Sequence, residues 1–208
     1  KVPDRIVTMA EDSWTVHRRS RSEMISSETL PTPEAITWPA SDGTMIHGLY
    51  YPPTSNCFLG AGKPPAIVCI HGGPAGQQTA VYSSEVPFFT SRGYAYLYVN
   101  YRGSTGYGRS YMTALREHWG EYDTEDAVSG ARALIDQHLA DPDRIVIKGG
   151  SAGGYTVLNA LVHHPGVFRA GLCLYGVSNL FSLATDTHKF EARYLDMMVG
   201  NLPETGDR

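Results

Sequence analysis

The sequence predicts an α/β fold, in which a mostly parallel β-sheet carries helices on both faces. From residue 34 onward, strand-like apolar runs alternate with helix-like segments, which is the pattern of such a sheet. A glycine-rich turn at 149–154 joins one of these runs directly to an apolar helix, and a second glycine pair, at 72–73, follows an earlier apolar run. The chain has 208 residues, 42% of them hydrophobic, which is enough for one domain with its own core.

Six segments have the composition of strands. The first two flank a turn at Asp42-Gly43 and indicate a hairpin. The others are short and apolar almost throughout, as expected for strands buried on both faces. The predicted strands are residues 35–38, 45–51, 66–70, 94–99, 144–148 and 170–175.

Three segments are predicted to be helical. The first covers 85–92, with Ser84 as its capping residue and Gly93 beyond its end. After a long loop at 100–122, apolar residues keep a 3.6-residue period behind a second capping candidate, Asp123, and Pro142 ends that helix. The third helix covers 153–163 and begins at the glycine-rich turn.

Residues 1–33 differ from the rest of the chain. They alternate loosely between apolar and polar residues, like one or two isolated strands, before Pro31 and Pro33 interrupt the pattern. We interpret them as the remnant of a preceding β domain and its linker. The α/β domain is then expected to occupy 34–208.

Composition and charge exclude several classes of function. The net charge is −4, and the arginines near the N-terminus stand between serines, so a nucleic-acid partner is not expected. The sequence has neither an apolar signal core at its start nor a run of the ~20 apolar residues that a membrane span needs. We therefore expect a cytoplasmic protein without a membrane partner.

The chain also lacks the usual signs of a metal or cofactor. Its three cysteines cannot all pair, and two of them lie inside apolar runs, where free cysteine packs as a small hydrophobic residue. It contains neither an HExxH motif nor a cluster of cysteines and histidines. No metal site and no organic cofactor are predicted.

The turn Gly149-Gly150-Ser151-Ala152-Gly153 contains the pattern G-x-S-x-G. It stands between a predicted strand and a predicted helix, which is the context of the nucleophile elbow in α/β-hydrolases. Such a turn forces the serine into strained backbone geometry, and small residues two positions to either side prevent clashes. Ser151 is therefore the predicted nucleophile. The alternatives are a glycine-rich turn without chemistry or a phosphate loop, but the glycine spacing and the Gly-Lys-Ser/Thr element of phosphate loops are missing.

A second motif, His71-Gly72-Gly73-Pro74, follows the predicted strand 66–70. In α/β-hydrolases this loop supplies one backbone N–H of the oxyanion hole, and the residue after the nucleophile supplies the other. Gly73 and Ala152 are the predicted donors. In this fold the catalytic base follows the serine along the chain, so His71 is expected to have a positioning role and not to be the base.

These two motifs, together with VNYRGSTGYGRSY at 99–111 and Trp119-Gly120…Asp126, resemble the prolyl oligopeptidase family of serine peptidases. The resemblance covers about residues 34–203 and is closest to the branch of acylaminoacyl-peptidases and related oligopeptidases or aminopeptidases. The HGGP form differs from the HGGG and GDSAGG motifs of hormone-sensitive-lipase-like esterases.

The resemblance implies an N-terminal β-propeller, for which 1–33 would be the last strands, and short peptides as substrates. It also implies a pocket for the residue before the scissile bond. The segment after the last strand would line this pocket with the apolar side chains Val177, Leu180 and Phe190. Arg102 and Tyr107 belong to the loop signature, where structural pairing and not catalysis is expected.

The catalytic acid and histidine are the missing part. They should follow Ser151, beyond two further strands, and the usual sheet has eight strands where six are predicted here. His163 and His164 end the helix that starts at the nucleophile, about 18 Å away at 1.5 Å per residue. Asp186 and His188 are in the right order but only two residues apart. We therefore expect a truncated domain, with the acid and the base beyond Arg208, an uncovered edge strand, and no activity of these 208 residues alone.

The predicted function is that of a serine peptidase that forms an acyl-enzyme on Ser151. Two alternatives remain. One is a carboxylesterase of the same fold, since the same machinery cleaves esters. The other is a hydrolase-like binding module without catalysis.

Overall fold

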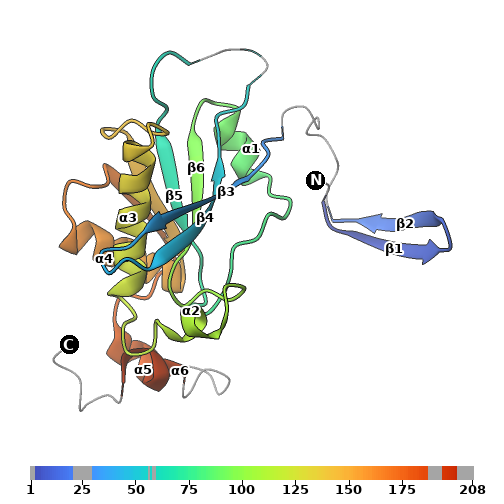
Figure 1. The fold of residues 1–208 in the computed structure, drawn as a ribbon. Coiled ribbons are helices and arrows are strands. Elements are labelled where there is room, and N and C mark those ends of the chain that lie inside the picture. The colour runs from blue at the N-terminus through green and yellow to red at the C-terminus, as the bar shows by residue number, and fades with distance from the viewer. Residues whose placement is uncertain (1–2, 21–29, 56, 58–59, 187–193, 201–208) are drawn as a thin grey trace.

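The computed structural model describes residues 3–20, 30–55, 57, 60–186 and 194–200. This part of the chain forms a six-stranded sheet flanked by helices, and a separate hairpin (Figure 1). The sheet contains β3 (Glu34–Pro39), β4 (Met45–Tyr51), β5 (Ala66–Ile70), β6 (Ala95–Asn100), β7 (Ile145–Gly150) and β8 (Ala170–Leu174). The helices are α1 (Glu85–Thr90), α2 (Arg109–Thr113), α3 (Tyr122–Asp136), α4 (Ala152–His163), α5 (Leu180–Asp186) and α6 (Tyr194–Val199).

The strand order in the sheet is β3-β4-β6-β5-β7-β8. β4 pairs antiparallel with both of its neighbours, and all other neighbouring strands are parallel. Ile70 at the end of β5 is in register with Val99 of β6 and with Gly149 of β7. The carboxyl ends of β5 and β7 therefore lie side by side. This register places the two glycine motifs, which follow these strands, next to each other.

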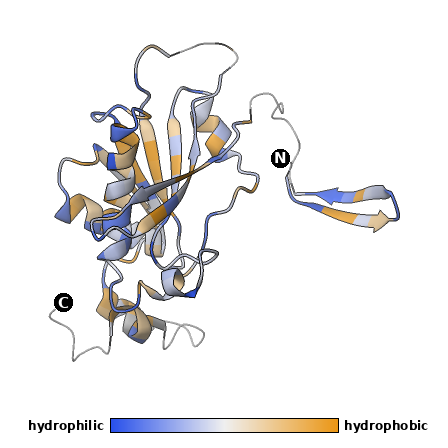
Figure 2. Cartoon of the chain, in the orientation of Figure 1, coloured by the Kyte–Doolittle hydropathy of each residue, from blue (hydrophilic) through white to orange (hydrophobic). Residues whose placement is uncertain are grey.

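The two faces of the sheet are buried by different helices. Because side chains alternate along a strand, Val68, Leu97 and Ile147 belong to the larger core cluster, which includes residues of α3 and α4. Ile67 and Tyr96 point to the opposite face, where they pack with residues of α1. In Figure 2 the orange of hydrophobic residues runs along the central strands. The predicted α/β-hydrolase fold, with helices on both faces of a mostly parallel sheet, is confirmed.

Most predicted elements agree with the structure to within one or two residues, but the helix ends differ. Ser84 stands at the N-cap position of α1 without a capping bond from its side chain, and the Ser83 hydroxyl instead accepts the Glu85 N–H at 3.2 Å. α3 begins one residue before Asp123 and ends at Asp136, well before Pro142. His138, with φ of 61°, turns the chain after α3. The short helix α2 inside the loop 100–122 was not predicted.

The N-terminal segment forms the antiparallel hairpin of β1 (Arg5–Ala10) and β2 (Ser13–Arg19), as the loose alternation indicated. It makes a two-stranded sheet of its own (Figure 1). Large apolar side chains stay exposed on it, including Trp14 at 67% and Ile6 at 66%. Its origin as part of a propeller stays a prediction.

In the six-stranded sheet, β8 lies at the end opposite β3. It pairs with β7 and is an edge strand within the described part of the chain. Leu172 on β8 is 52% exposed. This agrees with the expected uncovered edge at 170–175.

Candidate active site

Ser151 forms the sharp turn between β7 and α4. Its backbone has φ of 55° and ψ of −122°, a conformation that residues with a side chain rarely adopt. Holding such a residue costs about 1–3 kcal/mol, which the surrounding structure must supply. The Ser151 side chain is exposed at this turn. The structure thus has the strained, exposed serine that the sequence predicted.

The glycines on either side of Ser151 are needed because three backbone segments meet there. A methyl group at Gly149 would lie 2.2 Å from the carbonyl oxygen of Gly153. One at Gly153 would lie 2.4 Å from the carbonyl oxygen of Ile70, at the end of β5. Both distances are far below van der Waals contact, so any side chain at these positions would force α4 away from the sheet.

Backbone hydrogen bonds hold Ser151 from two directions. Its N–H donates to the Leu174 carbonyl at the end of β8, at 3.0 Å. Its carbonyl accepts from the N–H groups of Gly154 (2.9 Å) and Tyr155 (3.2 Å) in the first turn of α4. The Ala152 N–H is the first of α4, and the N–H groups of the first turn have no acceptor within the helix. It is therefore available to a ligand beside the serine.

The loop 71–74 lies directly against this turn. A methyl group at Gly72 would lie 3.2 Å from the Gly150 carbonyl oxygen and 3.5 Å from Ser151 Cβ. Gly73 has φ of 135°, and a methyl group there would lie 2.7 Å from the backbone nitrogen of Gly76. The two glycines therefore let the loop turn tightly and approach the serine closely. The structure brings Gly73, Ala152 and Ser151 together at the carboxyl ends of β5 and β7.

Hydrogen bonds from the last residue of β6 and from the segment after it hold the loop 71–78 in place. The Tyr101 hydroxyl donates to the Pro74 carbonyl at 2.9 Å, and the Thr105 N–H donates to the Gly76 carbonyl at 2.9 Å. The Asn100 side chain accepts the Gln78 N–H at 2.8 Å and donates to the Gln78 carbonyl at 3.0 Å. The motif NYRGSTGY therefore supports the HGGP loop, a pairing that no local pattern in the sequence indicates.

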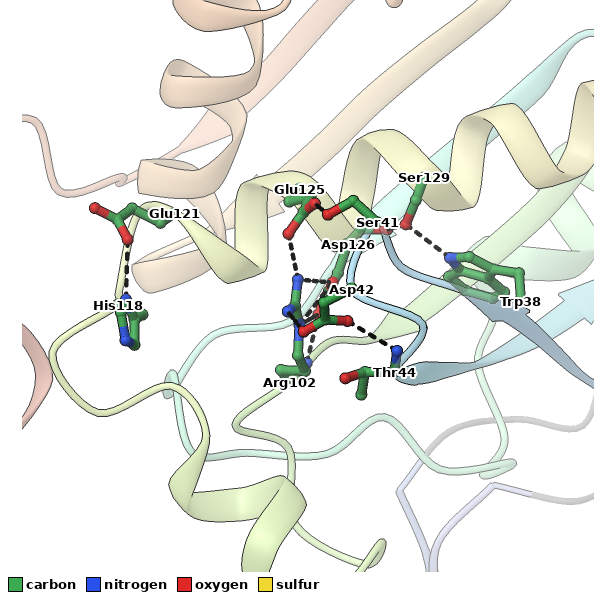
Figure 3. Close-up of polar contacts among 10 residues, drawn as sticks. All are labelled: Trp38, Ser41, Asp42, Thr44, Arg102, His118, Glu121, Glu125, Asp126 and Ser129. Carbon is green, nitrogen blue, oxygen red and sulfur yellow. Dashed lines mark hydrogen bonds and ion pairs between the residues drawn. The ribbon is translucent and has the colours of Figure 1, made fainter.

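Arg102 anchors the turn between β3 and β4 to α3, as Figure 3 shows. The residue is 2% exposed, and its guanidinium contacts Asp126 at 2.7 Å, Glu125 at 2.5 Å and Asp42 at 3.0 Å. Burial alone would lower the pKa of Arg102, but the hydrogen bonds and the charge of Asp126 raise it above its ordinary value. Structural pairing of Arg102 is thus confirmed. Tyr107 is paired as well, since its hydroxyl accepts from the Asn100 amide at 2.8 Å.

Asp123 does not cap α3 from outside but lies buried in its first turn, a correction to the sequence analysis. Its carboxylate accepts the Gly120 N–H at 2.6 Å and the Thr156 hydroxyl from α4 at 2.5 Å. Burial raises the pKa of Asp123 to about 6, although these hydrogen bonds oppose the shift. Asp123 therefore links α3 to α4 through Thr156, which lies in the second turn of α4 after Ser151. It uses its carboxylate for this contact and does not cap α3, as its position in the sequence had suggested.

The predicted pocket residues lie in the segment after β8. Val177 and Leu180 are half-buried and pack against the main core, and the Val177 N–H reaches the Ser151 carbonyl at 3.4 Å. Leu180 also lines a cavity of about 430 Å³ that runs along α4 past Tyr155 and Asn159. Phe190 lies outside the described residues. The specificity role of these three residues stays a prediction.

The histidines after Ser151 do not reach the elbow in the described part of the chain. His163 is the last residue of α4 and His164 follows it, so the length of the helix separates both from the serine. α5 ends at Asp186, and His188 lies outside the described residues. Among the residues that the structure describes, no helix is long and apolar enough to cross a membrane.

Comparison with known proteins places these features in a family. The profile of the prolyl oligopeptidase family matches residues 80–206. A puromycin-hydrolysing peptidase of Mycobacterium tuberculosis has a similar structure, with 40% identity, a TM-score of 0.90, and coverage of 97% of this chain and 31% of that one.

Two curated relatives match parts of this chain at somewhat lower identity. Dipeptidyl aminopeptidase BIII of Pseudoxanthomonas mexicana is 31% identical over 135 residues, which is 65% of this chain and 20% of that protein. Acylamino-acid-releasing enzyme 1 of Oryza sativa subsp. japonica is 35% identical over 116 residues, 56% of this chain and 15% of that protein. The chain therefore spans less than a third of the length of these relatives.

Proposed function

Because the chain belongs to the prolyl oligopeptidase family, we propose that it carries the nucleophile half of a serine peptidase that cleaves short peptides. The observation that carries the proposal is the backbone of Ser151, whose φ of 55° and ψ of −122° present an exposed hydroxyl between a strand and a helix. Backbone strain of this kind clusters at functional sites, and here it occurs at the position that the fold uses for its nucleophile.

In the proposed reaction, Ser151 Oγ attacks the carbonyl carbon of the peptide bond while its proton passes to a histidine base. The N–H groups of Gly73 and Ala152 hold the oxygen that becomes negatively charged. The intermediate collapses when the histidine returns the proton to the leaving amine, and an acyl-enzyme on Ser151 remains. Water then attacks the ester by the same route and releases the product.

The histidine and its acid partner are proposed to come from a segment after Arg208. In this fold both follow the nucleophile along the chain. The 31% coverage of the Mycobacterium tuberculosis peptidase leaves ample length for them, and for a β-propeller before residue 34. Short peptides as substrates are supported by the names of the relatives, which include a dipeptidyl aminopeptidase and an acylamino-acid-releasing enzyme.

The test uses the full-length protein and a fluorophosphonate probe, which modifies only an activated serine. Labelling should occur and should map to Ser151. Substrate pairs with the same acyl group, a peptide p-nitroanilide and the matching p-nitrophenyl ester, then separate a peptidase from an esterase. Turnover of the ester alone would support the carboxylesterase, and absence of labelling would support a binding module.

A further inference from the structure

The direction of the Gly73 N–H depends on the residue before it in the same peptide unit. The Gly72 carbonyl and the Gly73 N–H share one planar trans peptide, so they point in opposite directions and holding one orients the other. His71 Nδ1 lies 2.8 Å from the Gly72 carbonyl oxygen. A carbonyl oxygen can only accept, so Nδ1 must carry the proton and donate.

The second ring nitrogen of His71 contacts a serine from the other loop. His71 Nε2 lies 2.8 Å from Oγ of Ser104, a residue that is 0% exposed. Burial lowers the pKa of His71 and so favours the neutral ring. In a neutral imidazole with its proton on Nδ1, Nε2 is an acceptor. The Ser104 hydroxyl therefore donates to Nε2.

The ring itself is held in place by Tyr101, which is 0% exposed and stacks on it with centroids 4.4 Å apart. With its plane fixed, the remaining freedom of His71 is the choice of tautomer. If the proton moved to Nε2, Nδ1 would turn a lone pair toward the lone pairs of the Gly72 oxygen, and the contact would become repulsive. The Ser104 hydroxyl favours the tautomer that avoids this.

We infer that Ser104 is a positioning residue of the candidate active site: it holds His71 in the Nδ1–H tautomer, and this tautomer orients the peptide unit that carries the Gly73 N–H. The inference rests on the proposed function, because it assigns a task to the Gly73 N–H in the transition state. It predicts that Ser104 acts only through His71.

The first experiment is Ser104→Ala in the full-length protein, assayed with a peptide substrate. Removing an oxyanion donor altogether costs a factor of about 10²–10³ in kcat. A donor that is present but less well oriented should cost less, so kcat should fall about tenfold while KM changes little. The control is Ser110→Ala, which removes an exposed hydroxyl from α2 in the same loop region and should leave both constants unchanged.

The second experiment asks whether Ser104 acts through the ring. The side-chain amide of Asn places an N–H near the position of Nδ1 and has no counterpart of Nε2. In a His71→Asn background, adding Ser104→Ala should therefore have no further effect on kcat. His71→Gln, whose N–H reaches the position of Nε2 instead, should be slower than His71→Asn. A double-mutant cycle measures this coupling.

Folding is controlled by expressing each kcat per active site, counted from the endpoint of fluorophosphonate labelling. If Ser104→Ala does not fold, Ser104→Cys keeps the volume and replaces the hydroxyl by a weak donor, and a smaller loss of kcat with unchanged KM is expected. An unchanged kcat, or a full additive effect of Ser104 in the His71→Asn background, overturns the inference. If the wild-type protein is not labelled at Ser151, the proposed function itself fails, which is a different result.

Discussion

Ser151 and Arg102 both lie in glycine-containing motifs, but the structure supports them in opposite ways. Ser151 is exposed, and backbone crowding among Gly149, Gly153 and the end of β5 forces it into a strained conformation. Arg102 is 2% exposed and is satisfied by three carboxylates. In the first case the backbone positions the side chain, and in the second the side chain positions the backbone.

This difference separates residues that serve chemistry from residues that serve the fold. The side chain of an exposed residue can change with little loss of stability, because it makes few buried contacts. A buried charge cannot change without leaving its partners uncompensated. Substitutions at four positions test this contrast, from the largest expected effect to the smallest.

Ser151→Ala in the full-length protein should lower kcat/KM by about 10⁴-fold or more, since loss of the nucleophile removes the whole catalytic unit. Its stability should stay within about 0.5 kcal/mol of the wild type, because the hydroxyl is exposed. Ser151→Gly should be equally inactive but about 1 kcal/mol more stable, because glycine tolerates positive φ. Peptidase kinetics and urea unfolding measure both. Activity above about 1% in either variant contradicts the assignment.

Arg102→Met should show the opposite behaviour. Removing the cation leaves Asp126 buried with the backbone N–H of residue 102, at 2.7 Å, but without its opposite charge. Breaking a buried ion pair in this way typically costs about 3–5 kcal/mol of stability. The kcat of the folded fraction should change little, because Arg102 does not contact the elbow. Thermal unfolding and kinetics per labelled active site separate the two effects. Arg109→Met, at an exposed position of α2, is the matched control and should lie within about 0.5 kcal/mol of the wild type. A stable Arg102→Met protein with low kcat would assign Arg102 to the chemistry.

Asp123 sharpens the contrast because, unlike Asp126, its hydrogen bonds come from the neutral groups of Thr156 and Gly120. Its pKa of about 6 in the folded protein lies above the ordinary 3.8, so the folded state binds the proton more tightly than the unfolded chain. This group therefore contributes up to roughly 3 kcal/mol of stability, which is fully present below about pH 4 and is lost as the pH rises through about 6.

The neutral Asp123→Asn variant should lack this pH dependence. The free energy of unfolding of the wild type relative to the variant should fall between about pH 4 and pH 6 and stay constant above. Urea unfolding of both proteins across this range measures the difference, in which all other titrating groups cancel. Parallel profiles would show that Asp123 is ionised throughout.

Gly153→Ala should destabilise the protein less than Arg102→Met does. Its methyl group would meet the Ile70 carbonyl at 2.4 Å, and overpacking of this kind costs about 1–3 kcal/mol. Because α4 would move from β5, kcat should also fall. A methyl group at Gly60 would have no neighbour within 4 Å, so Gly60→Ala is the control and should be nearly neutral. A fully active and stable Gly153→Ala protein would show that the elbow tolerates a wider turn.

The strands and the glycine turns could be predicted because local interactions decide them. The continuously apolar run at 66–70 is a buried strand. The G-x-S-x-G turn between strand and helix has the strained backbone that was expected at Ser151, where φ is positive. Helix ends were predicted less well. Ser84 and Asp123 have the residue types of caps, but competition with Ser83 and with the α3–α4 contact decided their actual partners.

The sequence by itself determined the fold class, the family and the position of the strained serine, since periodicity and glycine spacing act over a few residues. Only the tertiary structure decided which distant groups meet. Arg102 finds Asp42 from 60 residues away, and Ser104 finds His71 from 33 residues away. Their hydrogen bonds depend on the strand order and on the register that sets Ile70 beside Gly149. Sheet pairing joins residues that are far apart in the sequence. The hydrogen bonds that support the site therefore could not be predicted from local patterns and follow only from the tertiary structure.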